Sequence, residues 1–408
     1  MTVTIADIEA ARRVMAGQTV RTPILPAPKL SALTGAEVFV KYENLQVTNS
    51  FKDRGAFIKL ASLSEAERAR GVIAMSAGNH AQAVAHHAAR LGIPAVIVMP
   101  VTTPFVKVSA TRSYGADVVL HGESVGEAQA QVEELMAARN YVQVHPYDDP
   151  RIVAGQGTVA LEMLEDVPDL EVLVVPIGGG GLIAGNAIAA KAIKPGTEVV
   201  GVEAALYPSM WNALRGAEHI SGGSTLADGI AVKKVTGLTV SIVRELVSDI
   251  LLVNEADLER AVNAFATAQK TVAEGAGAAG LAAMLAAPDR FRGKKVGVIL
   301  SGGNIDPRIL ASIMLRELER GRQIASFRLA IPDRPGVLGI IASKLGELGA
   351  NILEVDHRRL FLDVPAKGAK LDVTVETRDA SHVQDILKAL ADDGYMVQVI
   401  EPSGSGTA

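Results

Sequence analysis

The chain of 408 residues contains no cysteine, which excludes disulfide bonds, thiolate nucleophiles and cysteine-ligated zinc or iron–sulfur centres. Aromatic residues make up only 4%, too few for a base-stacking surface, and the 40 basic residues form no block among the 45 acidic ones. No apolar run reaches the length of about 18 residues that a membrane helix needs, and the N-terminus lacks the apolar core of a signal peptide. These absences predict a cytoplasmic protein that binds neither nucleic acid nor membrane.

Short β-branched runs alternate with helical patterns from residue 37 to residue 320. The runs are mostly apolar and lie at 94–100, 116–122, 171–181, 197–204 and 294–304. Strands that are apolar on both faces and joined by helices predict parallel sheets covered on each side, which is an α/β architecture. Ligands of such sheets bind beyond the C-terminal ends of the strands, where this sequence has glycine-rich turns.

The pattern changes after about residue 322. Strand, helix, strand, strand, helix and strand are predicted in that order at 326–332, 337–349, 351–359, 369–378, 382–394 and 395–400. This order predicts a complete βαββαβ ferredoxin-like unit. We therefore divide the chain into a first domain at 1–322, a second domain at 323–402 and a tail at 403–408, and we expect a smaller subdomain at about 47–145 to be inserted in a larger one within the first domain.

Four consecutive glycines at 178–181 leave a strand and open a helix. Several backbone N–H groups and a helix N-terminus then point to one place, which is typical of a phosphate site. A tight turn alone would not need four glycines, because each costs conformational entropy. A second interpretation stays open here: Gly179, Gly181 and Ala184 also fit a G-x-G-x-x-A dinucleotide fingerprint, with Glu203 placed to bind a ribose.

Two more strand-to-helix turns and one lysine carry polar groups. SAGNHAQ (76–82) could bind a small anion such as a carboxylate at a helix N-terminus, and SGGN (301–304) places Ser301 at the end of a buried strand. Lys52 lies in SFKDRGA (50–56), where a lysine between charged neighbours is usually solvated. Two anion-binding loops with a separate lysine suggest a phosphorylated carbonyl cofactor, because a lysine amine condenses with an aldehyde.

The motifs SFKDRGA, SAGNHAQ, HPYDDP (145–150), GGGGL (178–182) and SGGN occur in this order, and together they resemble the serine/threonine dehydratase family of fold type II pyridoxal-phosphate enzymes. The C-terminal unit, with DRPGVL (333–338) and GANI (349–352), resembles an ACT domain. The resemblance covers nearly the whole chain and implies the cofactor pyridoxal 5′-phosphate. Five ordered motifs are far more specific than one glycine loop, so they weigh strongly against the dinucleotide interpretation.

The resemblance also implies a role for individual residues. Lys52 would form the internal aldimine, Phe51 would pack beside the cofactor ring, Asn79 would bind its 3-hydroxyl and Ser301 would meet its ring nitrogen. The phosphate would be held by Gly178, Gly179, Gly180 and Gly181. The substrate carboxylate would be held by Ser76, Ala77, Gly78, Asn79 and His80.

Two departures within the wider family bear on the reaction. Related serine racemases carry a second serine where this chain has Ala77, which has no proton to give to the opposite face of Cα. Racemase-like members also hold a divalent cation with a glutamate and an aspartate six residues later, where this chain has Glu203 and Ser209. A hard cation prefers carboxylate ligands, so we predict no metal site and a structural role for Glu203.

The resemblance implies ammonia-lyase activity on L-threonine, with L-serine as a second substrate. Another lyase or isomerase of the family, acting on 3-hydroxyaspartate or serine, is the alternative, and a non-catalytic amino-acid sensor or an NAD-dependent oxidoreductase is more remote. The ACT-like unit implies regulation by an amino acid such as isoleucine or valine, bound near Asp333, Gly336 and Asn351. Pairing of such units predicts a homodimer or homotetramer.

Overall fold

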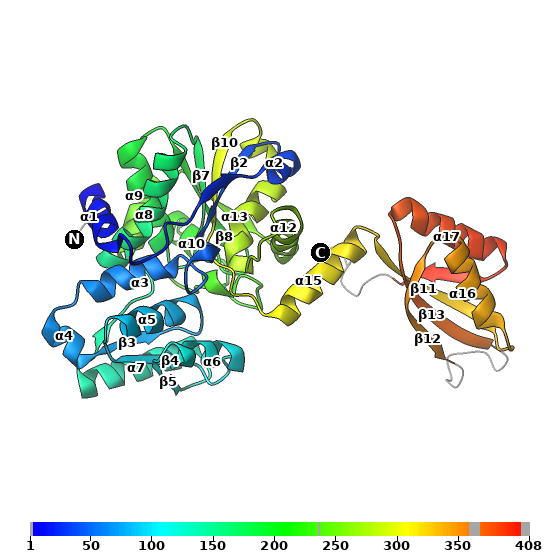
Figure 1. Ribbon diagram of the computed structural model, residues 1–408, viewed down its shortest axis with the longest axis horizontal. Helices are drawn as coiled ribbons and strands as arrows, with labels where there is room; N and C mark the ends of the chain where they lie inside the picture. The colour runs from blue at the N-terminus through cyan, green and yellow to red at the C-terminus, as the bar shows by residue number, and fades with distance from the viewer. Residues whose placement is uncertain (1–2, 236, 359–367, 401–408) are drawn as a thin grey trace. The chain divides into compact units, whose positions relative to one another are not determined.

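The computed structural model describes residues 3–235, 237–358 and 368–400 and divides the chain into two compact units, residues 1–305 and 306–408 (Figure 1). The division places helix α15 (Pro307–Arg320) in the second unit, whereas the boundary predicted at residue 322 placed it in the first. The predicted tail at 403–408 lies outside the described residues. No helix among the described residues is long and apolar enough to cross a membrane.

The larger sheet of the first unit has six strands in the order β1-β2-β10-β7-β8-β9. Five of these strands are parallel, and β1 pairs antiparallel with β2 at one edge. The bounds are β1 Ile24–Pro26, β2 Glu37–Tyr42, β7 Val172–Pro176, β8 Glu198–Ala204, β9 Asp249–Val253 and β10 Lys295–Leu300. The predicted parallel α/β architecture is confirmed.

Helices cover both faces of this sheet (Figure 1). Leu173 and Val175 of β7 belong to the core shared with α1 (Ile5–Met15), α8 (Pro150–Asp166) and α9 (Gly181–Ile193). The alternate residue Val174 faces α13 (Gly275–Ala286), and a Cβ at Gly280 of α13 would lie 3.5 Å from it. Because successive strand residues point to opposite faces, β7 must be apolar on both, as its sequence VLVVP is.

A smaller sheet of four parallel strands has the order β5-β4-β3-β6. The bounds are β3 Val72–Met75, β4 Ala95–Met99, β5 Asp117–Leu120 and β6 Val142–Gln143, with helices α3 Lys52–Ala61, α4 Glu65–Arg70, α5 Asn79–Arg90, α6 Phe105–Ser113 and α7 Val125–Arg139. Val72 and Ala74 pack with α3 and α5, whereas Ile73 packs with α7 on the opposite face. This sheet corresponds to the subdomain expected at about 47–145.

The second unit contains an antiparallel sheet with the order β12-β13-β11-β14. Its elements are β11 Ile324–Pro332, α16 Val337–Glu347, β12 Asn351–Arg358, β13 Gly368–Glu376, α17 Ala380–Asp392 and β14 Met396–Val399. Phe327 and Leu329 of β11 pack with Ile341 of α16 and Ile386 of α17, while Arg328 points the other way. The element order βαββαβ is the one predicted from the sequence.

Candidate active site

Lys52 is the first residue of α3, and its side chain enters the interior of the first unit. Its Nζ donates a hydrogen bond of 2.8 Å to the carbonyl oxygen of Pro146. Burial lowers the pKa of Lys52 to about 8, although the negative field of Glu274 opposes this shift. An amine with this pKa is neutral in an appreciable fraction of molecules near neutral pH, so it can act as a nucleophile or as a base.

The glycine loop follows β7 and ends where α9 begins. Gly180 has φ of +91°, a left-handed conformation, and Gly181 is the first residue of α9. A Cβ at Gly179 would lie 2.0 Å from Cδ1 of Tyr147, which leaves no room for a side chain. The carbonyl oxygen of Gly179 accepts a hydrogen bond of 2.8 Å from Oγ1 of Thr239. Close packing from two directions therefore fixes this loop at the N-terminus of a 13-residue helix.

The segment 145–150 connects Lys52 with the glycine loop. Pro146 accepts the hydrogen bond from Lys52, and the next residue, Tyr147, contacts Gly179 and Gly181. Asp148 then accepts hydrogen bonds from the backbone N–H groups of Leu238 and Thr239 at 2.9 and 3.3 Å, and so caps α11 (Leu238–Leu246). Asp149 caps α8, as the turn before Pro150 predicts. One hexapeptide thus holds three separate parts of the site together.

Asn79 begins α5, and its side-chain amide is engaged at both ends. Its Nδ2 donates to Oε1 of Glu274 at 2.6 Å, and its Oδ1 accepts from Nδ2 of Asn304 at 2.8 Å. Burial raises the pKa of Glu274 to about 7, and the nearby Asp228 adds to the effect, whereas the bond from Asn79 opposes it. The orientation of the Asn79 amide is therefore fixed by partners from two other segments.

Ser301 follows β10 and is 3% exposed. Its carbonyl oxygen accepts a hydrogen bond of 3.1 Å from the N–H of Phe51, and Gly302 pairs with Ser50 in an isolated β-bridge. A Cβ at Gly302 would lie 3.1 Å from Nδ2 of Asn79. The structure therefore brings the segments of Lys52, Asn79 and Ser301 together. The roles predicted for these residues toward a cofactor remain predictions.

The segment 76–80 contains the turn before α5 and the first two residues of that helix, with Gly78 as its cap. The N–H of Gly78 donates to Oγ of Ser76 at 3.2 Å. The side chain of His80 is turned away from this turn: it is 3% exposed, and its Nε2 lies 2.8 Å from the carbonyl oxygen of Val144. Burial and the positive charge of Lys52 lower the pKa of His80 to about 3, so its imidazole stays neutral. A contact of His80 with substrate is therefore left to its backbone.

Glu203 lies at the end of β8 and is 1% exposed. Its two carboxylate oxygens accept hydrogen bonds from the N–H groups of Met210 and Trp211 at 2.8 and 2.9 Å. These are N-terminal amides of α10 (Ser209–Arg215), so Glu203 caps that helix. Burial raises its pKa to about 7. Both oxygens are engaged, which leaves neither of them open to bind a ribose.

Sequence reasoning assigned no role to Tyr147, Asn304 or Thr239. Tyr147 belongs to HPYDDP and Asn304 ends SGGN, so both residues lie in the ordered motifs. No chemical role was predicted for either side chain. Thr239 lies in no motif. Glu274, in AEGAGA (273–278), was likewise not among the predicted site residues, and the structure places its carboxylate against Asn79.

Comparisons with known proteins agree with this geometry. The family model described as "Pyridoxal-phosphate dependent enzyme" matches residues 16–302. The L-threonine ammonia-lyase of Thermotoga maritima is 44% identical over 400 residues, which cover 98% of this chain and 100% of the relative. The catabolic L-threonine dehydratase TdcB of Escherichia coli is 45% identical over 309 residues, covering 74% and 94%. The structure of maize serine racemase has a TM-score of 0.72 at 33% identity, covering 79% of this chain and 100% of that chain. The chain therefore belongs to the pyridoxal-phosphate dependent enzyme family.

Proposed function

We propose that this protein is an L-threonine ammonia-lyase that converts L-threonine to 2-oxobutanoate and ammonia, and L-serine to pyruvate and ammonia. The cofactor predicted from the sequence, pyridoxal phosphate, is confirmed by the family. The observation that carries the proposal is the half-buried Lys52 amine, joined through the single segment 146–147 to a glycine loop at the start of α9. An amine and a phosphate cradle are the two things that this cofactor needs from a protein.

The residues of the site fit the cofactor. A Cβ at Gly180 would lie 2.6 Å from Cε of Met210, and one at Gly178 would lie 3.1 Å from Cα of Ile230, so side chains at these two positions would crowd the loop. In the proposal, Gly178, Gly179, Gly180 and Gly181 would hold the phosphate, and Lys52 would hold the carbonyl carbon. Asn79 would bind the 3-oxygen, and Ser301 would lie at the ring nitrogen. When bound, the cofactor accepts the electron pair left on the substrate Cα.

Lys52 would also move the proton. The Lys52 amine would remove the Cα proton of the bound substrate, and its lowered pKa leaves it neutral in an appreciable fraction of molecules. The turn at 76–80 holds the substrate carboxylate at the N-terminus of α5. The β-hydroxyl leaves as water after taking one proton. The resulting enamine tautomerises and takes up one water to release ammonia, so threonine gives 2-oxobutanoate and ammonia with no net change in water.

Ser301 favours elimination over transamination in this proposal. A neutral hydroxyl, unlike a carboxylate, does not hold a proton on the ring nitrogen, so the ring withdraws electrons less strongly. Prompt loss of the β-hydroxyl is then easier than a long-lived carbanion. Ala77 also favours elimination over racemisation. A racemase requires a proton donor at the second face of Cα, and the Ala77 side chain has no proton to donate.

A keto-acid assay with a panel of β-hydroxy amino acids tests the proposed function. We expect the highest kcat/KM for L-threonine, a lower one for L-serine and little product from L-threo-3-hydroxyaspartate. Chromatography on a chiral column would measure D-serine formed from L-serine in the same samples, and we expect pyruvate to exceed it. Absence of 2-oxobutanoate from L-threonine would contradict the assignment, and an excess of D-serine would support a racemase instead.

We further propose that the second unit is an ACT-type regulatory domain. Its βαββαβ order supports this, as does a surface hollow of about 490 Å³. The hollow is lined by Gly336, Gly339, Ile340, Ser343, Lys344, Glu347 and Asp393. Gly336 was predicted to bind an effector, whereas the other two predicted residues, Asp333 and Asn351, are not among the described residues that line this hollow. The edge strand β12 exposes Leu353 and Val355, which supports pairing of two chains through this sheet into a homo-oligomer.

An effector would bind two states of the protein with different affinity and so shift the substrate saturation curve. We expect isoleucine or valine to change the half-saturating threonine concentration by about fivefold or more. Saturation curves measured with each proteinogenic amino acid added in turn would check this. If none of them moved the curve, the regulatory proposal would be wrong while the catalytic one stood.

A further inference from the structure

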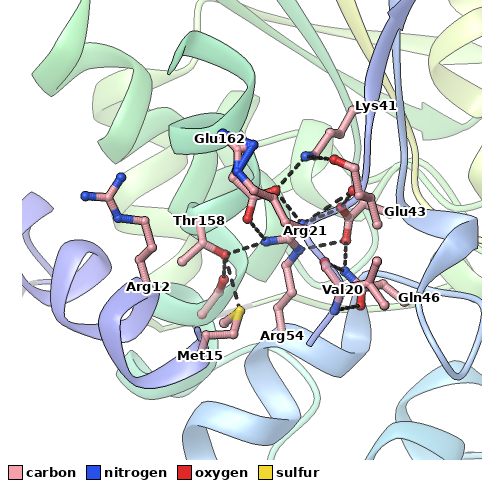
Figure 2. A network of polar contacts seen from close by, with 12 residues as sticks. Arg12, Met15, Val20, Arg21, Lys41, Glu43, Gln46, Arg54, Thr158 and Glu162 are labelled. Carbon is pink, nitrogen blue, oxygen red and sulfur yellow. Dashed lines mark hydrogen bonds and ion pairs between the residues drawn. The ribbon is translucent and has the colours of Figure 1, made fainter. Parts of the chain in front are cut away.

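Arg54 lies two residues after Lys52, and its guanidinium is fully buried (Figure 2). All five of its N–H groups are used. Nε and Nη2 donate to Glu43 at 2.8 and 2.7 Å, Nη1 and Nη2 donate to Glu162 at 2.7 and 2.9 Å, and Nη1 also donates to Thr158 at 3.1 Å. Burial disfavours the charge, yet attraction to the two carboxylates raises the pKa of Arg54. Both carboxylates thus meet the planar fork in paired hydrogen bonds, a geometry that lysine cannot reproduce.

The partners of Arg54 belong to the larger subdomain. Glu43 is in η1 (Glu43–Leu45), directly after β2, and Glu162 is in α8. A second buried cation, Lys41, donates to Glu162 and to the carbonyl oxygen of Thr22, both at 2.6 Å. Two cations and two carboxylates therefore form a neutral cluster that joins α3 to two other segments (Figure 2). Losing any one member would leave a buried charge unpaired, so the cluster has little freedom to rearrange.

The residues on either side of Arg54, Asp53 and Gly55, also hold the first turn of α3 in place. The carboxylate of Asp53 accepts a hydrogen bond of 3.0 Å from the N–H of Thr48 and lies 3.6 Å from Nε2 of His87 in α5. A Cβ at Gly55 would lie 2.3 Å from Nε2 of Gln156, so α3 meets α8 without space for a side chain. Each of the three residues after Lys52 is thus tied to a different neighbour.

We propose that Arg54 is a positioning residue for Lys52. The charge cluster of Arg54 fixes the first turn of α3 against η1 and α8. The Cα of Lys52 is thereby held in one position, from which its amine reaches the reacting carbon. The inference rests on the proposed role of Lys52. A lysine side chain has four rotatable bonds, so its reach is defined only if its Cα is held still. A displacement of about 1 Å in such a group can cost roughly 100-fold in rate.

Arg54→Lys tests the inference, because it keeps the charge and removes the fork. We expect kcat per cofactor-loaded site to fall about 100-fold, while KM for threonine and the dissociation constant of the cofactor change less than about threefold. A second readout needs no turnover: trace acetylation of Lys52 in the apoprotein across pH. The midpoint near pH 8 in the wild type should move toward the ordinary lysine value in the variant, because a loosened turn admits water to the amine.

Arg68→Lys is the matched control. Arg68 donates to the carbonyl oxygens of Leu63 and Ala61 near the other end of α3, and its replacement should leave both readouts unchanged.

If Arg54→Lys does not fold, the charge-neutral double variant Arg54→Met with Glu43→Gln takes its place. Wild-type hydrogen exchange adds a measurement without any variant: the amides of residues 53–56 should exchange as slowly as those of β7.

These experiments distinguish a failure of the inference about Arg54 from a failure of the proposed function. Unchanged kcat per loaded site and an unchanged acetylation midpoint in a folded variant would overturn the inference, as would fast exchange of the amides at 53–56. A wild type that does not act on threonine would contradict the proposed function, yet the acetylation midpoint and the exchange rates would still decide the role of Arg54.

Discussion

Replacing Lys52 with alanine is expected to lower kcat for L-threonine by about 10⁴-fold or more, because one side chain supplies both the covalent link to the cofactor and the base. Its half-buried amine donates to the carbonyl oxygen of Pro146, and the nearby His80 imidazole, whose pKa burial lowers to about 3, is a much weaker base. Steady-state release of 2-oxobutanoate would measure the loss. Borohydride treatment followed by peptide mass analysis should attach cofactor to the peptide containing Lys52 in the wild type alone.

Lys59→Ala provides the control for this experiment. Lys59 lies in the same helix but pairs with Asp149 at 2.6 Å, and we expect its loss to leave kcat within about twofold of the wild type and to cost at most about 1 kcal/mol of stability. If Lys52→Ala kept more than a few per cent of the wild-type kcat, another group would have to be the base, and the proposed mechanism would be wrong.

The contacts that hold the segment of Lys52 in place could not be predicted from the sequence. A lysine followed by Asp and Arg is ordinarily a surface residue, yet Asp53 is 1% exposed and Arg54 is 0% exposed. Both are buried because they find partners far along the chain: Arg54 meets Glu162, 108 residues away. Nothing local in the sequence selects Glu162 among 45 acidic residues. The ordered motifs identified the lysine, and only the fold identified what holds it.

Strands β4, β5, β7, β8 and β10 were the easiest elements to predict, because runs such as VLVVP are apolar on both faces. Strands β1, β2, β6 and β9 were not among the predicted runs, and β1, three residues ending in proline, carries no periodic signal. At the site, the glycine loop and Ser301 were found from strand-to-helix turns. Tyr147 and Thr239 were not predicted, because they matter through contacts with Gly179, and the spacing of residues in the sequence does not indicate such contacts. Family membership also decides against the dinucleotide interpretation of the same glycines.

The contact between Tyr147 and Gly179 leads to the second large effect. Gly179→Ala would place a Cβ 2.0 Å from Cδ1 of Tyr147, so either the ring or the loop must move. Overpacking of this kind costs about 1–3 kcal/mol, and a displaced loop would weaken cofactor binding by about 10- to 100-fold. Equilibrium dialysis of the apoprotein against pyridoxal phosphate would measure the change. Gly196→Ala is the control, because a Cβ there meets nothing within 4 Å.

A double variant decides whether the steric contact is the cause. Tyr147→Ala removes the ring atoms that the new Cβ would meet, so Gly179→Ala combined with Tyr147→Ala should bind the cofactor more tightly than Gly179→Ala does alone. The appropriate reference is Tyr147→Ala by itself, since residues in contact are not additive. If Gly179→Ala bound the cofactor within twofold of the wild type, the loop would not be the rigid phosphate cradle that its four glycines and the N-terminus of α9 suggest. The phosphate would then have to be held elsewhere in the first unit.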